Sequence, residues 1–492
     1  MFSEEEIKEE REKDWRKELR EKIKSSDRAK KERISMPEED ATSRSRNSVE
    51  VNKGLSVEQA LSESERCLDC ANPTCISGCP VGINIPKFIK KIESKDFAGA
   101  AIILKETNTL PAVCGRVCPQ EIQCEARCFY TLKLGKDAVG IGNLERFAAD
   151  YERNSGKISI PEVSKNNGIM IAVAGSGPAG LTAACDLSRL GYQVTVFEAL
   201  HEIGGVLKYG IPGFRLPNEI INLEIDNLRK MGIHFETNYI VGKTESFHEL
   251  KKQGYQAFFI GSGAGLPNFM NIPGENLVGI FSSNEYLTRV NLMGASKPEY
   301  DTPVLSGKKV AVIGGGNTAM DSVRTALRLG AEKAMIIYRR TMDEMPARKE
   351  EMKHALEEGV EIITLQNPVA YIGNDKSRVR QIRLQKMTLG EPDASGRRRP
   401  VPVENSEYLM DVDTVIVSVG VSPSPIIPLA LPEIEMTRWG TIKVNPDNMQ
   451  SSVPWIFAGG DIVRGGATVI LAMGDGRKAA IGIHEFIQNK IK

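Results

Sequence analysis

The fold of this chain is decided by the stretch Gly175-Ser176-Gly177-Pro178-Ala179-Gly180. An apolar run over residues 169–174 precedes it, and a helix-like segment over residues 181–190 follows. A second apolar run ends at Glu198, eighteen positions after Gly180. Strand, glycine turn, helix, strand and acid in this order are typical of a dinucleotide-binding βαβ unit, in which the glycines admit a pyrophosphate and the acid binds a ribose. The alternative is an ordinary surface turn.

A second unit of the same kind begins with the strand-like run over residues 309–313. It continues with the turn Gly314-Gly315-Gly316-Asn317-Thr318-Ala319, a helix and a further strand. This strand ends in Arg339 and Arg340 instead of an acid. Because arginine binds phosphate through two hydrogen bonds whereas an acid repels it, the pair predicts NADP(H) over NAD(H). The alternative is that both arginines only face solvent.

Eight of the nine cysteines lie in two groups within residues 67–128. Thiolates are the ligands of iron–sulfur clusters, and a Cys-Pro pair at the end of a run is typical of ferredoxins. Two zinc sites are the alternative, but the region holds no histidine and its cysteine spacings are irregular. Disulfide bonds are the weakest alternative. The expected metal ligands in chain order are Cys67, Cys70, Cys75, Cys79, Cys114, Cys118, Cys124 and Cys128.

Length and composition place the chain among globular α/β proteins. It has 492 residues, 45 glycines and a formal net charge of zero, which gives no indication of nucleic-acid binding. No apolar run approaches the ~20 residues of a membrane span, and no signal peptide is recognisable. We therefore expect a cytoplasmic protein. The ninth cysteine, Cys185, lies in the first glycine-turn helix and is expected to be a buried packing residue.

The pattern along the chain predicts five segments. Residues 1–35 carry 12 basic and 11 acidic side chains and are expected to form one loosely ordered helix, with a clip on a partner as the alternative. Residues 36–160 are the cysteine-rich domain, in which residues 85–107 read as a single helix. The first nucleotide unit covers residues 161–290 and 411–492, because late strand-like segments look like a return to it. The second unit, residues 291–410, is then inserted in the first.

Several motifs resemble one family of flavin and iron–sulfur proteins. The chain resembles the small (beta) subunit of NADPH-dependent glutamate synthase, and equally the large subunit of NADH-dependent ferredoxin:NADP oxidoreductase and the N-terminal half of dihydropyrimidine dehydrogenase. The resemblance begins at about Met36. It is carried by Arg66-Cys67-Leu68-x-Cys70, Cys79-Pro80-Val81, Leu110-Pro111-Ala112-Val113-Cys114-Gly115-Arg116-Val117-Cys118-Pro119, Ile141-Gly142-Asn143-Leu144-Glu145-Arg146, Gly210-Ile211-Pro212-x-Phe214-Arg215-Leu216-Pro217, Tyr338-Arg339-Arg340 and Gly459-Gly460-Asp461.

The resemblance implies a helical domain with two 4Fe–4S clusters, followed by an FAD domain of the glutathione-reductase type that is interrupted by an NADPH domain. Carried over residue by residue, one cluster is held by Cys67, Cys70, Cys75 and Cys128. The other is held by Cys79, Cys118 and Cys124. The fourth ligand of the second cluster stays open between Glu145, at the place where relatives have Gln or Glu, and Cys114.

The resemblance also implies the cofactor contacts. FAD would lie on Gly175, Gly177, Pro178, Ala179 and Gly180 with Glu198 at its ribose, and further contacts would come from Gly205, Leu207, Arg215, Gly460, Asp461 and Thr468. NADPH would use Gly314, Gly315, Gly316, Asn317 and Thr318 for its pyrophosphate, and Arg339, Arg340 and Arg348 for its 2′-phosphate.

The implied function is electron input. The chain would pass electrons from NADPH through FAD and two 4Fe–4S clusters to the large, FMN-containing amidotransferase subunit of glutamate synthase, which makes L-glutamate from L-glutamine and 2-oxoglutarate. One alternative is the large subunit of the electron-bifurcating ferredoxin:NADP oxidoreductase, with a ferredoxin-reductase-like partner. Another is a non-catalytic electron-transfer or assembly module. Hydride transfer needs no side-chain acid or base, so we expect no catalytic residue. We expect the chain to be part of a hetero-oligomer.

Overall fold

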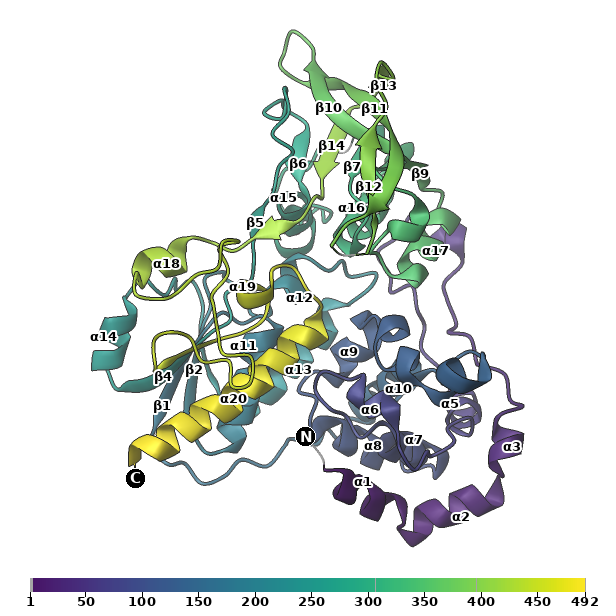
Figure 1. Cartoon of the computed structure of the whole chain (residues 1–492), viewed down its shortest axis with the longest axis vertical. Helices are drawn as coiled ribbons and strands as arrows, with labels where there is room; N and C mark the ends of the chain where they lie inside the picture. Colours follow the sequence, from purple (N-terminus) through teal and green to yellow (C-terminus); the bar gives the residue numbers. More distant parts are fainter. Residues whose placement is uncertain (1–2, 306, 395, 492) are drawn as a thin grey trace.

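The computed structural model describes residues 3–305, 307–394 and 396–491. Figure 1 shows a helical N-terminal lobe and two α/β units, each built on a parallel sheet. The expected fold class, two dinucleotide-type α/β units behind a helical domain, is confirmed.

The first unit is a five-stranded parallel sheet with the strand order β16-β4-β1-β2-β3. Its central strand β1 pairs in parallel with both β2 and β4. The helices α11 and α20 pack against each other and against this sheet (Figure 1). The strands are β1 (Met170–Ala174), β2 (Gln193–Phe197), β3 (His234–Glu236), β4 (Tyr255–Ile260) and β16 (Ile456–Ala458), and the helices are α11 (Pro178–Arg189), α12 (Val206–Tyr209), α13 (Asn218–Lys230), α14 (Phe247–Lys252), α18 (Ile426–Ala430), α19 (Asp461–Arg464) and α20 (Val469–Ile491).

The second unit combines a parallel sheet of order β6-β14-β7-β8-β9 with an antiparallel sheet of β10, β11, β12 and β13. Its parallel strands are β6 (Ile280–Ser282), β7 (Lys309–Ile313), β8 (Lys333–Tyr338), β9 (Glu361–Thr364) and β14 (Thr414–Val417). The antiparallel strands are β10 (Gln366–Gly373), β11 (Val379–Pro392), β12 (Arg398–Pro402) and β13 (Tyr408–Asp411). The helices are α15 (Ser283–Leu287), η4 (Thr288–Leu292), α16 (Asn317–Arg328), η5 (Met342–Glu344) and α17 (Lys349–Glu357).

The second unit is inserted in the first, but both borders differ from those expected at residues 291 and 410. β6 pairs in parallel with β14, with Val415 opposite Ile280, so both strands belong to the second unit. The chain instead crosses at a short antiparallel link between β5 (Leu266–Pro267) and β15 (Val421–Ser422). The pairing joins segments that are far apart in the sequence, so no local pattern reveals it.

The helical lobe contains the cysteine region. The single helix expected over residues 85–107 is wrong, because the chain breaks between α7 and α8. Lys95 adopts a left-handed φ of 65°, and the side chain of Asp96 accepts the N–H of Gly99 as the cap of α8. The helices are α4 (Ala41–Arg44), α5 (Val57–Ser64), α6 (Thr74–Ser77), α7 (Ile85–Glu93), α8 (Phe97–Lys105), α9 (Pro111–Val117), η1 (Gln120–Ile122), η2 (Glu125–Arg127), η3 (Tyr130–Leu134) and α10 (Ile141–Ser155).

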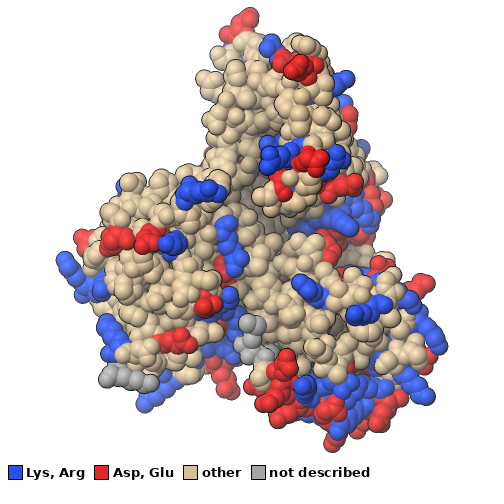
Figure 2. All heavy atoms as spheres, viewed as in Figure 1, with Lys and Arg blue, Asp and Glu red and all other residues tan. Residues whose placement is uncertain are grey.

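Residues 3–35, called the N-terminal arm below, form three short helices along the edge of the helical lobe (Figure 1). These are α1 (Glu4–Arg11), α2 (Asp14–Lys22) and α3 (Ser25–Arg28). Charged side chains gather over this region of the surface (Figure 2). The expectation of one loosely ordered helix is wrong, because Arg16 and Arg28 are only 2% and 1% exposed and are fixed in the lobe.

One hydrophobic core runs through the helical lobe and the first unit. It joins Val113 and Leu144 of the lobe to Leu181 and Ile470 of the first unit. The second unit has separate cores on either side of its parallel sheet. The lobe and the first unit are therefore packed as one body. Among the described residues, no helix has the length and apolar character needed to cross a membrane.

Candidate functional site

The first glycine turn forms a cradle with no room for a side chain at Gly175 or Gly180. Gly175 has a φ of 103°, and a Cβ on Gly180 would lie 2.0 Å from the carbonyl oxygen of Gly175. Gly177 begins helix α11, whose first N–H groups point toward the turn. Gly205, with a φ of 54°, lies so close that its Cβ would be 2.9 Å from the Cα of Gly177. These contacts fit a site where a pyrophosphate approaches the backbone.

Glu198 follows β2 and is held at this turn. Its Oε2 accepts the backbone N–H and the hydroxyl of Ser176 at 2.9 Å and 2.6 Å, and its Oε1 accepts the N–H of Leu200 at 2.8 Å. The hydroxyl of Ser176 also accepts the N–H of Gly204. Ser176 thus joins three loops. The sequence did not predict this role, because the glycine motif allows any residue at this position.

The end of β16 adds a second edge to the cradle. Gly460 has a φ of 77°, and a Cβ there would meet that of Ala179 at 3.0 Å. Burial raises the pKa of Asp461 to about 6, and its carboxylate accepts the N–H of Ala467. Asp475, which sequence reasoning missed, fixes this loop by accepting the N–H of Gly460 at 3.0 Å.

Two further residues expected at the FAD site flank this cradle. Leu207 is fully buried in α12. Thr468 lies directly before α20, where its hydroxyl accepts the N–H of Leu471 at 3.4 Å and the side-chain amide of Gln123 at 3.5 Å. Gln123 belongs to the helical lobe, so the loop around Thr468 joins the first unit to the lobe.

The second glycine turn has the same construction. Gly314 has a φ of 136°, and its Cβ would lie 2.2 Å from the carbonyl oxygen of Ser418. A Cβ on Gly315 would lie 2.8 Å from the ring of Tyr338. Gly316 begins α16, which contains Asn317 and Thr318 in its first turn. The structure therefore brings both predicted dinucleotide turns into the required conformation.

The basic residues expected at the 2′-phosphate do not stand together. Arg339 is exposed after β8. Arg340 is buried and donates to the carbonyl of Arg398 and to the carboxylate of Asp393, both at 2.7 Å. Arg348 is turned toward the helical lobe, where it donates to Gln120 at 2.9 Å. Arg340 and Arg348 thus bind protein partners in this structure, whereas Arg339 is exposed.

Arg215 is also placed differently from the expectation. Its guanidinium forms ion pairs with Asp321 on α16 at 2.8 Å and with Glu351 on α17 at 2.9 Å. The neighbouring Phe214 carries the guanidinium of Arg328 at 3.8 Å from its ring centre. This stretch of the first unit therefore braces the second unit.

The first cysteine group surrounds a small cavity in the helical lobe. Cys67, Cys70, Cys75 and Cys128 all line it. Burial and the neighbouring thiols raise the pKa of the Cys75 thiol well above its usual value, and burial raises that of Cys67 to about 12. Cys67 and Cys128 are buried, whereas Cys70 and Cys75 are partly exposed. Four neighbouring thiols can become thiolates together only where a metal centre compensates their charge.

The second cysteine group lies on the side of the lobe that faces α20. Cys79, Cys118, Cys124 and Cys114 influence one another electrostatically, together with Glu145. Glu145 is buried and accepts the amide of Asn108 at 2.7 Å, and burial raises its pKa to about 8. The thiol of Cys114 donates to the side-chain oxygen of Asn108 at 3.6 Å, so both candidates for the fourth ligand contact the same asparagine.

The sulfur spacing separates clusters from single zinc ions. Four thiolates on one zinc ion, with Zn–S bonds of ~2.3 Å at tetrahedral angles, would place their sulfur atoms roughly 3.8 Å apart. Among the described residues, no three cysteine sulfurs lie within 4.8 Å of one another. A four-iron cluster holds its cysteines at the corners of a larger body. In the described part of the chain, the cysteines therefore form no compact single-zinc site, and the all-thiol donor set fits iron–sulfur clusters.

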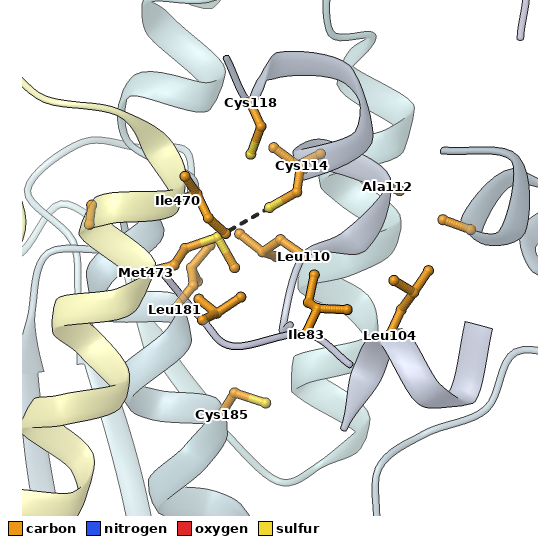
Figure 3. Packing of buried hydrophobic residues seen from close by; sticks show 14 of the residues in the cluster. Ile83, Leu104, Leu110, Ala112, Cys114, Cys118, Leu181, Cys185, Ile470 and Met473 are labelled. Atoms are coloured by element: carbon orange, nitrogen blue, oxygen red, sulfur yellow. Dashed lines mark hydrogen bonds between the residues drawn. The ribbon is translucent and has the colours of Figure 1, made fainter. Parts of the chain in front are cut away.

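The second cysteine group touches the first unit directly. The sulfur of Cys114 lies 3.5 Å from that of Met473 on α20 (Figure 3). One residue further, a Cβ on Gly474 would lie 2.9 Å from the carbonyl oxygen of Pro80, the residue after Cys79. The first turns of α20 and the second cysteine group are therefore in van der Waals contact.

Comparisons with known proteins agree with this division. A family model described as dihydropyrimidine dehydrogenase domain II, 4Fe-4S cluster, matches residues 44–157. Another, described as pyridine nucleotide-disulphide oxidoreductase, matches residues 169–476. The two matches cover the helical lobe and most of the α/β units.

Similar whole chains are glutamate synthase (NADPH) small chains. That of Azospirillum brasilense is 36% identical over 92% of this chain and 94% of its own length, and that of Escherichia coli is 38% identical over 93% and 98%. The putative oxidoreductase AegA of Escherichia coli is 40% identical, but the match covers only 66% of its length.

Solved structures show the same fold for the α/β units. FprA from Mycobacterium tuberculosis in complex with NADPH matches with a TM-score of 0.55 and 20% identity, over 66% of this chain and 85% of FprA. Thioredoxin reductase from Lactococcus lactis matches with a TM-score of 0.50 and 20% identity, over 65% and 99%.

Proposed function

This chain belongs to the family of NADPH-dependent glutamate synthase small chains, and from that premise we propose that it is the electron-input subunit of a glutamate synthase. It oxidises NADPH and delivers the electrons to a large subunit that makes L-glutamate from L-glutamine and 2-oxoglutarate. FAD and two 4Fe–4S clusters bound to this chain supply the conversion of a two-electron donor into one-electron steps.

The residues of the chain bind and orient these groups. The turn from Gly175 to Gly180 and the N-terminus of α11 bind the FAD pyrophosphate, and Glu198, fixed by Ser176, binds the ribose. The turn from Gly314 to Gly316 and the N-terminus of α16 bind NADPH. Arg339 binds the 2′-phosphate as the exposed cation at the end of β8.

A single observation carries the proposal, the contact between the second cysteine group and α20. Met473 and Cys114 place α20, which packs on the helix α11 that begins at the glycine cradle, against the second cysteine group (Figure 3). The helical lobe and the first unit share one hydrophobic core, so this contact is fixed by packing. A carrier in the cradle is then next to a carrier in the lobe, which is the arrangement that electron transfer requires.

The first cysteine group lies toward the surface and suits delivery to a partner. Phe129 lines its cavity and is nevertheless 42% exposed. Leu132 and Leu134 on η3 are exposed beside it. A large subunit covering these residues would bring its own acceptor close to that cluster.

The fourth ligand of the second cluster stays a choice between Glu145 and Cys114. A carboxylate is a harder ligand than a thiolate, so the two assignments differ in the potential of the cluster. We expect only one of Glu145→Gln and Cys114→Ser to change the electron paramagnetic resonance spectrum of the reduced second cluster. A change with Cys114→Ser alone would remove Glu145 from the ligand set.

Some relatives of this chain are subunits of other enzymes, which supports an alternative partner. The chain is 36% identical to the beta subunit of an NADP-dependent formate dehydrogenase from Moorella thermoacetica, over 60% of that protein. The same module therefore occurs with other chemistries, and the large subunit of a bifurcating ferredoxin:NADP oxidoreductase is the second candidate.

The deciding experiment is anaerobic co-purification with the large subunit, followed by assay of NADPH oxidation. We expect oxidation that depends on both glutamine and 2-oxoglutarate, and its loss in Cys70→Ser while FAD stays bound. Exposed Lys17→Ala is the matched control and should keep full activity. Oxidation that ignores both substrates but reduces ferredoxin would support the second candidate instead.

A further inference from the structure

The N-terminal arm lies outside both matched family models, which begin at residues 44 and 169. Three of its arginines nevertheless converge on one residue, Asp69, which stands between Cys67 and Cys70. Arg16 forms a buried ion pair with the Asp69 carboxylate, and Arg20 donates to it at 2.7 Å. Arg11 donates to the carbonyl oxygen of Asp69 at 2.8 Å.

Asp69 needs such support for two reasons. Its side chain is fully buried, and an unpaired carboxylate there would carry a large desolvation cost. Its φ of 51° is left-handed, a conformation that few non-glycine residues adopt without being held by their surroundings. This turn determines how the Cys67 and Cys70 side chains are presented to their common cavity.

A fourth arginine of the arm fixes the start of the same loop. Arg28 donates to the carbonyl oxygen of Glu65 at 2.7 Å and lies within 3.5 Å of that of Cys67. It is neutralised by Glu93 at 2.7 Å, and Lys90 donates to the Cys67 carbonyl from the opposite helix. The arm therefore contacts the ligand loop before, within and after its first cysteine.

These contacts leave positive charge beside the ligand loop. Arg16 and Arg20 share the single carboxylate of Asp69. The other acidic partner of Arg20 is Glu12, 3.5 Å away and 52% exposed, where solvent weakens the interaction. An iron–sulfur cluster with four thiolates becomes more negative on reduction, so nearby uncompensated cations favour its reduced form.

We propose that the N-terminal arm is a positioning element for the cluster held by Cys67, Cys70, Cys75 and Cys128. Arg16 and Arg20 hold the Asp69 turn in its ligand-presenting conformation and raise the reduction potential of that cluster. The inference rests on the proposed ligand set, but it does not depend on which partner accepts the electrons.

The test uses the full-length holoprotein without its partner. We expect Arg16→Ala/Arg20→Ala to lose up to half of its iron under a chelator challenge, with FAD content unchanged. Arg16→Lys/Arg20→Lys keeps both charges. It should therefore recover at least half of the difference in iron retention between the double alanine variant and wild type. Lys17→Ala and Lys30→Ala remove exposed cations of the same arm and should behave as wild type.

A milder variant keeps the test independent of folding. Arg20→Gln leaves Arg16 on Asp69, so the cluster should stay bound while its reduction potential shifts to a more negative value in a potentiometric titration. Arg20→Lys should show less of that shift. Full iron retention in the double alanine variant, or an unchanged potential in Arg20→Gln, would overturn the corresponding half of the proposal. A Cys70→Ser variant that keeps all its iron would instead refute the ligand set.

Discussion

Replacing Arg215 by alanine should weaken the attachment of the second unit without removing FAD. The side chains of Arg215, Asp321 and Glu351 are only 6%, 5% and 5% exposed, so the ion pairs between them are shielded from solvent. Alanine would leave two buried carboxylates facing each other across the space of the lost guanidinium. Arg324 still neutralises Glu351, so the main uncompensated charge is that of Asp321.

The magnitude depends on pH. Removing one partner of a buried ion pair costs about 3–5 kcal/mol. Burial already raises the pKa of Asp321 to about 6, and loss of Arg215 would raise it further. Below that pKa the Asp321 carboxyl is neutral and the cost is small, whereas above it an unpaired charge is buried. We therefore expect a loss of about 3 kcal/mol or more at pH 8 and a clearly smaller loss at pH 5.5.

The assay is urea unfolding of holoprotein at both pH values, combined with FAD content and the rate of NADPH-driven dye reduction. We expect full FAD content, a lower stability and a slower rate. Arg229→Ala removes an exposed pair with Asp226 and should cost no more than about 0.5 kcal/mol at either pH. Unchanged stability together with lost FAD would refute this reasoning and return Arg215 to the flavin phosphates.

Two further changes test other parts of the site, and a third tests the contact between α9 and α13, where Glu224 accepts the backbone N–H of Ala112 at 3.2 Å. Arg339→Ala should raise the KM for NADPH about 10-fold and leave the KM for NADH unchanged, since one charge-assisted contact is worth roughly 1.5 kcal/mol; equal effects would exclude a phosphate contact. Gly180→Ala should abolish FAD retention on a desalting column, because its Cβ would meet Gly175. Burial raises the pKa of Glu224 to about 7 from 4.5, so its stabilising contribution is present below pH 4.5 and is lost as the pH rises through 7. Glu224→Gln should therefore be more stable than wild type at pH 8 by roughly 3 kcal/mol and similar at pH 4.5, as measured by unfolding in urea.

The sequence sufficed for features that local chemistry determines. Both glycine turns are predictable because only glycine fits at their tightest positions. A Cβ at Gly180 would collide with the backbone of Gly175, and one at Gly314 with the backbone of Ser418. The strands on either side alternate little and are buried, as parallel strands are. The cysteine groups were equally readable, because thiolate ligands are identified by residue type and spacing.

The sequence did not suffice to predict which groups the buried arginines bind. Arg340 and Arg348 follow a nucleotide motif and were assigned to a phosphate, yet they bind Asp393 and Gln120. A cation at a motif position shows only that an anion or a carbonyl is nearby, and a distant segment can supply it. The N-terminal arm failed for the same reason, since its arginines find Asp69 only after the chain has folded.

The division of the cores bears on how the two halves of the reaction are linked. The cradle and the second cysteine group belong to one hydrophobic core, so their relative position is fixed by close packing. The second unit has its own cores and is joined through the β5–β15 link and through ion pairs such as Arg215 with Asp321. A link made of a two-residue strand pairing and a few ion pairs constrains relative position less than a shared apolar core does. Movement of the second unit would therefore change how nicotinamide approaches the flavin but leave the flavin-to-cluster distance unchanged, so NADPH binding and electron delivery can be altered separately.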